Sequence, residues 1–139
     1  MVSNKNNDGM IFPKGGWETD ETAEEAAARE SMEEAGVRGD LEYLGEFTFS
    51  SRKKHGKQGP QAGCIAQVYV MQVTEEMAVW PEQSTRHRAW CSPGEAVATC
   101  KHEWMRVALS RWGEKYYPEL QLSASTVAAK GESTVPVSV

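Results

Sequence analysis

The chain has 139 residues, enough for one domain with a single hydrophobic core, and 40% of them are hydrophobic. Its formal net charge of −5 argues against general binding to nucleic acid or to an anionic membrane surface. Its three cysteines form no CxxC pair, and neither a membrane-spanning apolar run nor a leader-like N-terminus is visible. We therefore expect a monomeric intracellular protein, in the cytoplasm or, if an N-terminal segment is missing, in an organelle.

The N-terminal part predicts short extended segments. Residues 10–12 (Met-Ile-Phe) read as a strand, and residues 2–4 could supply another. Gly15 and Gly16 follow, and glycines allow the backbone to approach other groups closely.

A helix is predicted next, because its two ends carry clear signals. Thr22 is a suitable N-cap, and Glu25 three residues later completes a capping box. The helix is expected to run to Ala35, with Gly36 as the left-handed residue that ends it. At helical spacing one face is acidic (Glu30, Glu33, Glu34), and the opposite face is expected to pack (Ala28, Met32, Ala35).

The acidic face of this helix admits two interpretations. Like charges three or four residues apart cost about 0.2–0.5 kcal/mol per pair, and a bound divalent cation such as Mg²⁺ or Mn²⁺ would offset that cost. The alternative is a solvated charged face on which Arg29 bridges Glu25 and Glu33.

The complete spacing favours the first interpretation. Gly15, Glu21, Arg29-Glu30, Glu33-Glu34 and Gly36 stand at offsets that resemble the Nudix box, the signature of Nudix hydrolases. The one departure is Ser31, which replaces a usually apolar residue and by angle flanks the packing face. The resemblance implies an α/β (α+β) fold, an α/β/α sandwich with a mixed sheet. Members usually carry two or more strands before the box, so we expect an N-terminally truncated form that lacks the first strand.

Downstream, the pattern predicts three more strands and a basic loop. Residues 40–50 alternate as a half-buried strand, residues 64–73 read as a central strand buried on both faces, and residues 85–91 read as a strand with Trp90 in the core. The basic stretch lies at residues 51–57, between the first two of these strands.

The C-terminal third predicts two helices. Ser92 caps a short one that ends at Cys100, and an apolar stripe at helical spacing marks a second one before Pro118 (Met105, Ala108, Leu109, Trp112, Tyr116). Residues 1–118 are thus the expected domain, and residues 119–139 a flexible tail.

The family resemblance also implies roles for individual residues. The metal ligands would be Glu30, Glu34, Glu33 and the carbonyl of Gly15. Glu33 is our choice as general base, with Glu30 as the alternative. Glu21 and Arg29 would orient the loop and the helix through an ion pair.

The stretch from Phe12 to Glu18 and the triplet Arg88-Ala89-Trp90 resemble diphosphoinositol polyphosphate phosphohydrolases and their plant relatives. The expected substrate is a polyphosphorylated small molecule with a diphosphate linkage, and the expected phosphate contacts are Lys14, Arg52, His55, Arg88 and Lys5. Dinucleoside polyphosphates and ADP-ribose remain alternative substrates. A non-catalytic module that binds a phosphorylated ligand is the alternative function.

Overall fold

The computed structural model describes residues 1–3, 9–16, 18–50, 63–120 and 136–138. Its elements in chain order are β1 (Val2–Ser3), β2 (Met10–Ile11), α1 (Ala23–Ala35), β3 (Val37–Ser50), β4 (Gly63–Glu76), α2 (Pro93–Thr99), α3 (Glu103–Tyr116), the 3₁₀ turn η1 (Pro118–Leu120) and β5 (Pro136–Ser138). Helices and strands are both well represented, so the chain has the predicted α+β class.

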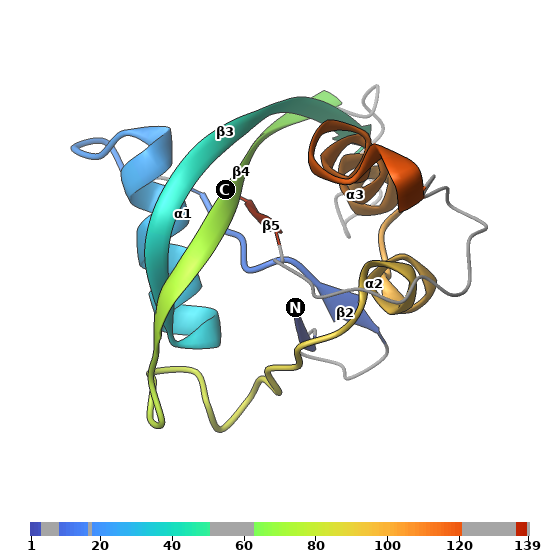
Figure 1. The fold of residues 1–139 in the computed structure, drawn as a ribbon. Helices are drawn as coiled ribbons and strands as arrows, with labels where there is room; N and C mark the ends of the chain where they lie inside the picture. Colours follow the sequence, from blue (N-terminus) through green and yellow to red (C-terminus); the bar gives the residue numbers. More distant parts are fainter. Residues whose placement is uncertain (4–8, 17, 51–62, 121–135, 139) are drawn as a thin grey trace, which may run out of the picture.

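A long antiparallel hairpin of β3 and β4 dominates the fold, and it is strongly curved (Figure 1). Its register runs from Val37 opposite Glu76 to Ser50 opposite Gly63. β5 pairs with the other edge of β4, which makes β4 the central strand of three. β1 and β2 form a separate antiparallel pair, and a single parallel bridge links Met10 to Cys100.

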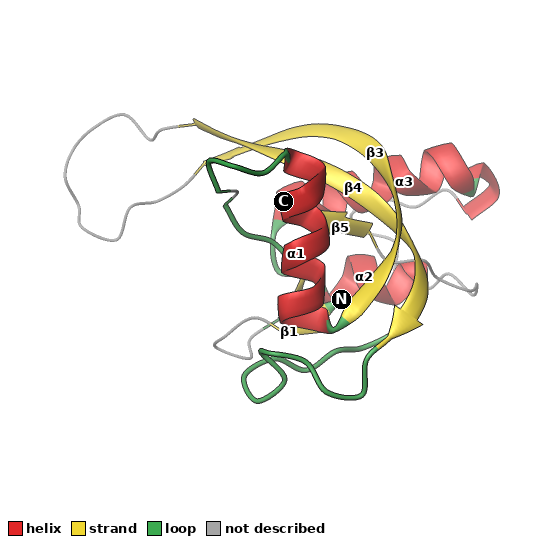
Figure 2. Cartoon of the chain, turned by 90° about the vertical axis from the view of Figure 1, so that its left-hand side faces the viewer, coloured by secondary structure: helices red, strands yellow, loops and turns green. Residues whose placement is uncertain are grey.

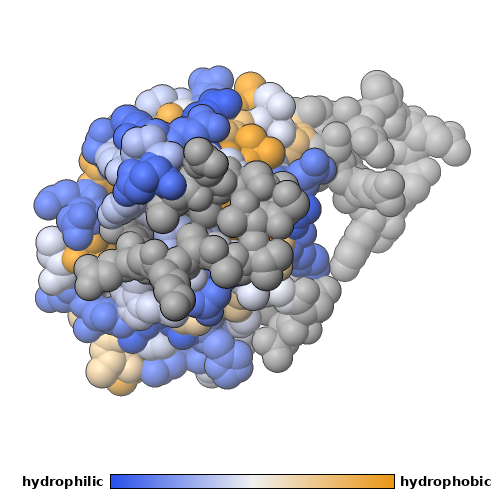
Figure 3. Space-filling view, turned by 45° about the vertical axis from the view of Figure 1, so that its right-hand side comes forward, coloured by the Kyte–Doolittle hydropathy of each residue, from blue (hydrophilic) through white to orange (hydrophobic). Residues whose placement is uncertain are grey.

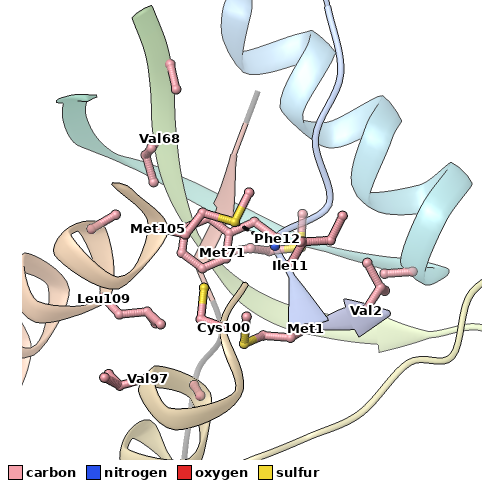
Figure 4. Packing of buried hydrophobic residues seen from close by; sticks show 14 of the residues in the cluster. Met1, Val2, Ile11, Phe12, Val68, Met71, Val97, Cys100, Met105 and Leu109 are labelled. Atoms are coloured by element: carbon pink, nitrogen blue, oxygen red, sulfur yellow. Dashed lines mark hydrogen bonds between the residues drawn. The ribbon is translucent and has the colours of Figure 1, made fainter. Parts of the chain in front are cut away.

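The helices pack on this hairpin at different places. α1 lies against β3 and β4, while α3 packs against β3 at the other end of the curve (Figures 1 and 2). The main core forms between them from residues of nearly every element. In Figure 4 the ring of Phe12 lies beside Met71 and Met105, and the Phe12 N–H donates to Met105 Sδ at 3.4 Å. The segment that leads into the loop with Gly15 and Gly16, which we call the glycine loop, is therefore anchored in the core through Phe12.

The predicted helix ends are confirmed. Thr22 Oγ1 accepts from the Glu25 N–H at 3.1 Å, and Glu25 Oε1 accepts from the Thr22 N–H at 2.9 Å, which is a complete capping box. Gly36 ends α1 at φ 64°. Ser92 caps α2, and α3 buries Met105, Ala108, Leu109 and Trp112 as its stripe predicts.

The predicted packing face of α1 is wrong in part. Ala35 is buried, but Ala28 is exposed and Met32 is only half-buried. The buried residues are Ala26, Ala27, Ser31, Glu34 and Ala35. Ser31 is tolerated there because its hydroxyl donates to the Ala27 carbonyl at 2.7 Å. The helix is thus rotated about its axis relative to our expectation, and the rotation carries Glu34 inward.

The predicted strand over residues 85–91 is also wrong, since only Arg88 bridges to Val2. Trp90 is 45% exposed rather than in the core, and its indole N–H donates to Glu76 Oε1 at 2.8 Å. This segment instead contacts the C-terminal end of α1, as described below. β4 is central as predicted but is not buried on both faces throughout, because Ile65 is 62% exposed.

At the C-terminus, Pro136–Ser138 form β5, a strand that the composition of the tail did not predict. None of the helices in the described part of the chain combines the length and the apolarity needed to cross a membrane. On the face shown in Figure 3, hydrophilic residues prevail among the coloured atoms and hydrophobic ones are scattered between them.

Candidate active site

The centre of the site is the contact between Gly15 and the Glu30 carboxylate. The loop that leads from β2 to α1 passes so close to the helix that a Cβ on Gly15 would lie 2.5 Å from Glu30 Cδ and closer still to Oε1. A side chain at this position would have to displace the Glu30 carboxylate. Gly15 therefore permits the observed position of the Glu30 carboxylate, which lies directly against the backbone here.

Glu34 adds a second carboxylate, and it is only 1% exposed. Its Oε2 accepts from the Lys14 N–H at 3.0 Å, and its Oε1 lies 3.0 Å from Arg86 Nη2. The direction of this ion pair is poor for a hydrogen bond, so Oε1 accepts none from the described residues. A buried carboxylate oxygen with an unused lone pair is unusual in a folded protein.

The protonation of Glu34 reflects this environment. Burial is the largest cause that raises its pKa, followed by the hydrogen bond to Glu30, while the charge of Arg86 opposes the rise; the resulting pKa is about 8. Two carboxyl groups that share a buried position resist being ionised together. A divalent cation between them would relieve that repulsion.

Arg29 organises the more exposed side of the same helix. Its guanidinium contacts Glu21 through two nitrogens at 2.8 and 3.1 Å, Glu30 Oε1 at 2.9 Å and Glu33 Oε2 at 3.3 Å. Its Nη2 also donates to the Gly16 carbonyl at 3.1 Å. The hydrogen bond from Arg29 is the main reason why the pKa of Glu21 is lowered. The predicted ion pair between Glu21 and Arg29 is present, and it ties the glycine loop to the helix.

The structure brings Glu30 and Glu34 together but leaves Glu33 apart. The Glu33 side chain is 40% exposed and is directed to Arg29. Within the described residues no group of three or more His, Cys, Asp or Glu side chains is placed to hold a metal ion. The donor set at Glu30, Glu34 and the Gly15 carbonyl consists of oxygens alone, which suits a hard divalent cation such as Mg²⁺ or Mn²⁺.

An open space of about 510 Å³ lies on the flank of α1 next to Glu33. It is lined by Ala28, Arg29, Met32, Glu33, Arg38, Gly39 and Met71. Ala28 and Met32 line this space, which is why they are not buried as predicted. A ligand in it would meet the carboxylate of Glu33 and the guanidinium of Arg38.

The residues predicted to contact phosphate differ in where the structure places them. Lys5, Arg52 and His55 lie outside the described residues. Lys14 is exposed beside the site, and its backbone N–H is bound to Glu34. Arg88 is directed to the C-terminal end of α1, where its Nη1 donates to the Ala35 carbonyl at 2.9 Å and the Met77 carbonyl at 3.0 Å. It also stacks on the Trp80 ring, 4.3 Å from the centroid. Its role in phosphate binding stays a prediction, and these contacts compete with it.

The sequence did not indicate that Trp80 and Glu82 contact the end of α1. The indole N–H of Trp80 donates to the Glu34 carbonyl at 3.0 Å, and the Glu82 N–H donates to the Glu33 carbonyl at 2.9 Å. Both lie in a stretch that the sequence marks only as a loop, through Glu75, Glu76 and Trp80-Pro81. The one available signal was Gly36, because a helix that ends on a glycine can accept a large ring close to its backbone.

Comparison with known proteins shows the family of the chain. The sequence model of the NUDIX domain matches residues 2–112. The chain is 44% identical over 131 residues to "Nudix hydrolase 16, mitochondrial" of Arabidopsis thaliana, covering 94% of this chain and 73% of the relative. It is 40% identical over 144 residues to "Nudix hydrolase 13, mitochondrial" of the same plant, covering 97% and 71%. A human diphosphoinositol polyphosphate phosphohydrolase is 33% identical over 140 residues, covering 98% and 67%. The chain therefore belongs to the Nudix family and is a Nudix-type pyrophosphohydrolase.

Proposed function

We propose that the chain hydrolyses the diphosphate linkage of a polyphosphorylated small molecule, in a reaction that depends on Mg²⁺ or Mn²⁺. The observation that carries the proposal is the pair of carboxylates Glu30 and Glu34 set against the backbone of Gly15, with a buried Glu34 oxygen that accepts no hydrogen bond from the described residues. These groups would hold the cation. A bound cation supplies Lewis-acid neutralisation of phosphate charge, worth several kcal/mol of barrier.

Glu33 is our candidate for the general base. Its side chain is 40% exposed, whereas that of Glu30 is 12% exposed, so water reaches Glu33 more easily. Glu33 borders the open space beside α1, where a substrate has room. Arg29 contacts both carboxylates and fixes their separation. The transfer needs a water in line with the leaving group, and a carboxylate that accepts its proton.

For the substrate, we propose a diphosphoinositol polyphosphate or a dinucleoside polyphosphate. The likeness to a human protein named for the first class supports this proposal. The basic segment at residues 51–57 supports it too, because a net acidic chain needs local positive charge to bind a polyanion. We also propose an intracellular location, cytoplasmic or in an organelle, and the word mitochondrial in the names of several relatives supports the organelle.

The test is a substrate panel with the purified chain of 139 residues. Diphosphoinositol polyphosphate, a dinucleoside polyphosphate and ADP-ribose are incubated with Mg²⁺, with Mn²⁺ or with a chelator, and phosphate products are quantified. We expect turnover of one of the first two with either metal and none with the chelator. The Glu33→Gln variant should lose at least about 100-fold in kcat, and the matched Glu24→Gln variant on the exposed side of the same helix should keep its rate.

Preference for ADP-ribose would overturn the substrate proposal alone. Undiminished turnover by Glu33→Gln would overturn the assignment of the base. Metal-dependent binding of all three compounds without turnover would contradict the proposed hydrolysis.

A further inference from the structure

The segment between β4 and α2 closes around the C-terminal end of the catalytic helix. The last carbonyls of a helix have no partner within it and need donors from elsewhere. Here the Glu33 carbonyl accepts from the Glu82 N–H at 2.9 Å, and the Gly36 carbonyl accepts from the Met77 N–H at 2.7 Å. The carbonyls between them receive side-chain donors from Trp80 and Arg88, as described above. The segment is thus a cap on α1, and we call residues 77–88 the capping segment.

The capping segment also delivers Arg86 to the active site. The guanidinium is buried, with 10% of the side chain exposed. Its Nη2 lies 3.0 Å from Glu34 Oε1, its Nη1 donates to the Ser3 carbonyl at 3.2 Å, and its Nε donates to Glu82 Oε1 at 3.0 Å. Each of its three nitrogens therefore contacts a different part of the chain: α1, β1 and the capping segment itself.

The contact between Arg86 and Glu34 is an ion pair without a hydrogen bond. Arg86 lowers the cost of ionising Glu34, which is almost completely buried and which must lose its proton to bind a cation. Yet Glu34 Oε1 accepts no hydrogen bond from the described residues, although Arg86 Nη2 is 3.0 Å away. This is the arrangement that a carboxylate needs if it is to be held in place and still bind a cation.

We infer that Arg86 is a positioning residue, which holds the buried Glu34 carboxylate in its ligating orientation and is not itself a phosphate ligand. The inference rests on the proposed function, because it assumes that Glu34 binds the metal. The inference gives Arg86 a different role from Arg38. The Arg38 side chain is 64% exposed, lines the open space beside Glu33, and lies 3.8 Å from Glu75. Phosphate could approach Arg38 without breaking contacts, whereas at Arg86 it would have to displace three.

The experiment measures Mn²⁺ binding directly, by electron paramagnetic resonance of free Mn²⁺ titrated with metal-free protein. The full chain is compared with Arg86→Met, Arg86→Lys and Trp80→Phe. We expect Arg86→Met to bind Mn²⁺ about 10–100-fold more weakly, as is typical when a partner of a ligand is removed. Arg86→Lys, which keeps the charge, should recover most of the affinity. Trp80→Phe removes a capping hydrogen bond to Glu34 without touching its carboxylate, so it should lower the midpoint of thermal unfolding and leave Mn²⁺ affinity unchanged.

A second measurement needs no metal. In chelator at pH 8, the double variant Arg86→Met/Glu34→Gln should unfold at a higher temperature than Arg86→Met alone, because the introduced glutamine needs neither a partner for a buried charge nor a proton held far above the ordinary pKa of a carboxyl group. If Arg86→Met fails to fold, Arg86→Lys and the double variant still decide the question.

The outcomes separate the two proposals. Wild-type affinity for Mn²⁺ in Arg86→Met overturns the inference and leaves the proposed function standing. A raised KM at saturating Mn²⁺ with unchanged Mn²⁺ affinity overturns it in favour of a substrate ligand. If the wild-type chain itself binds no Mn²⁺, the proposed function and the inference fail together.

Discussion

At the scale of single residues, the site depends on one position without a side chain and one buried charge. Gly15 lets the loop reach Glu30, and the buried Glu34 side chain is held by the Lys14 N–H and the Arg86 guanidinium. Each of these residues is ordinary alone. Their combination puts two carboxylates and a peptide backbone in contact, and substitutions here should affect chemistry more than folding.

The two neighbouring glycines offer a matched pair for testing this. In Gly15→Ala the new methyl group must push the Glu30 carboxylate away, so we expect turnover to fall roughly 100-fold, as displacements of about 1 Å in active sites do. In Gly16→Ala the methyl group meets nothing within 4 Å, and the rate should stay within about twofold of wild type. Steady-state kinetics on both variants tests the prediction, and equal losses would contradict it.

The raised pKa of Glu34 predicts how stability depends on pH. The folded chain keeps the proton up to about pH 8, whereas the unfolded chain releases it near the ordinary value of 4.5. Between these values the folded state binds more protons, so the free energy of unfolding falls as pH rises, by roughly 1.4 kcal/mol for each unit of pKa difference. In Glu34→Gln this contribution is absent.

Urea unfolding of metal-free protein from pH 5 to pH 8 tests this. At pH 5 both proteins carry a neutral group at position 34, and their stabilities should agree most closely. The advantage of Glu34→Gln should grow towards pH 8. The exposed control Glu24→Gln should run parallel to wild type, and parallel profiles for Glu34→Gln as well would show that Glu34 titrates normally.

At the scale of elements, the sequence predicted helix ends better than helix faces. The capping box at Thr22 and the glycine at 36 are local signals, because the groups that they satisfy lie within a few residues. Which face of α1 is buried depends on partners far away in the chain. Five of the 13 residues of α1 are alanines and they lie on several sides of the helix, so hydrophobicity alone did not show that Ala27 and Ser31 face the core. It also did not show that Arg86 would make a buried Glu34 tolerable.

The same distinction explains the error at residues 85–91. Alternating arginines suggest a strand, and the arginines are indeed extended towards a common neighbour. That neighbour is the end of α1, and its unpaired carbonyls compete for the donors of this segment. Because such carbonyls become available only once the helix has folded, a local pattern could not predict the outcome.

The junction of α1 with its capping segment gives a prediction for Gly36. Any Cβ there meets two obstacles, the positive φ of 64° and the Trp80 side chain at 2.8 Å. We expect Gly36→Ala to lower the free energy of unfolding by at least about 1 kcal/mol. In a Trp80→Ala background the cost of Gly36→Ala should shrink, since one obstacle is gone. A double-mutant cycle by urea unfolding measures the coupling, and purely additive effects would rule out the Trp80 contact as a cause.

At the scale of the whole molecule, the site is assembled from distant parts of the chain. Gly15 follows β2, the glutamates belong to α1, and Arg86 follows β4, so all three must be in place before the carboxylates meet their partners. The fixed spacing of the box predicted the family and the glutamates, because that part of the site is local. The capping segment has no comparable spacing, which is why the sequence placed Arg86 in a predicted strand, as a secondary phosphate ligand beside Arg88, and not as a partner of Glu34.

Because folding and the site are coupled in this way, a bound cation should stabilise the entire chain. A ligand that binds only the folded state adds about 2.7 kcal/mol at one hundred times its dissociation constant. Protons compete with the cation for Glu34, whose pKa is about 8, so the stabilisation should be larger at pH 8.5 than at pH 6. Chemical unfolding with Mn²⁺ and with chelator at both pH values measures it. Glu34→Gln should lose the stabilisation by Mn²⁺, and Glu24→Gln should keep it. Equal stabilisation at both pH values would exclude Glu34 as the titrating ligand, because only a group that binds protons in this range makes the stabilisation depend on pH.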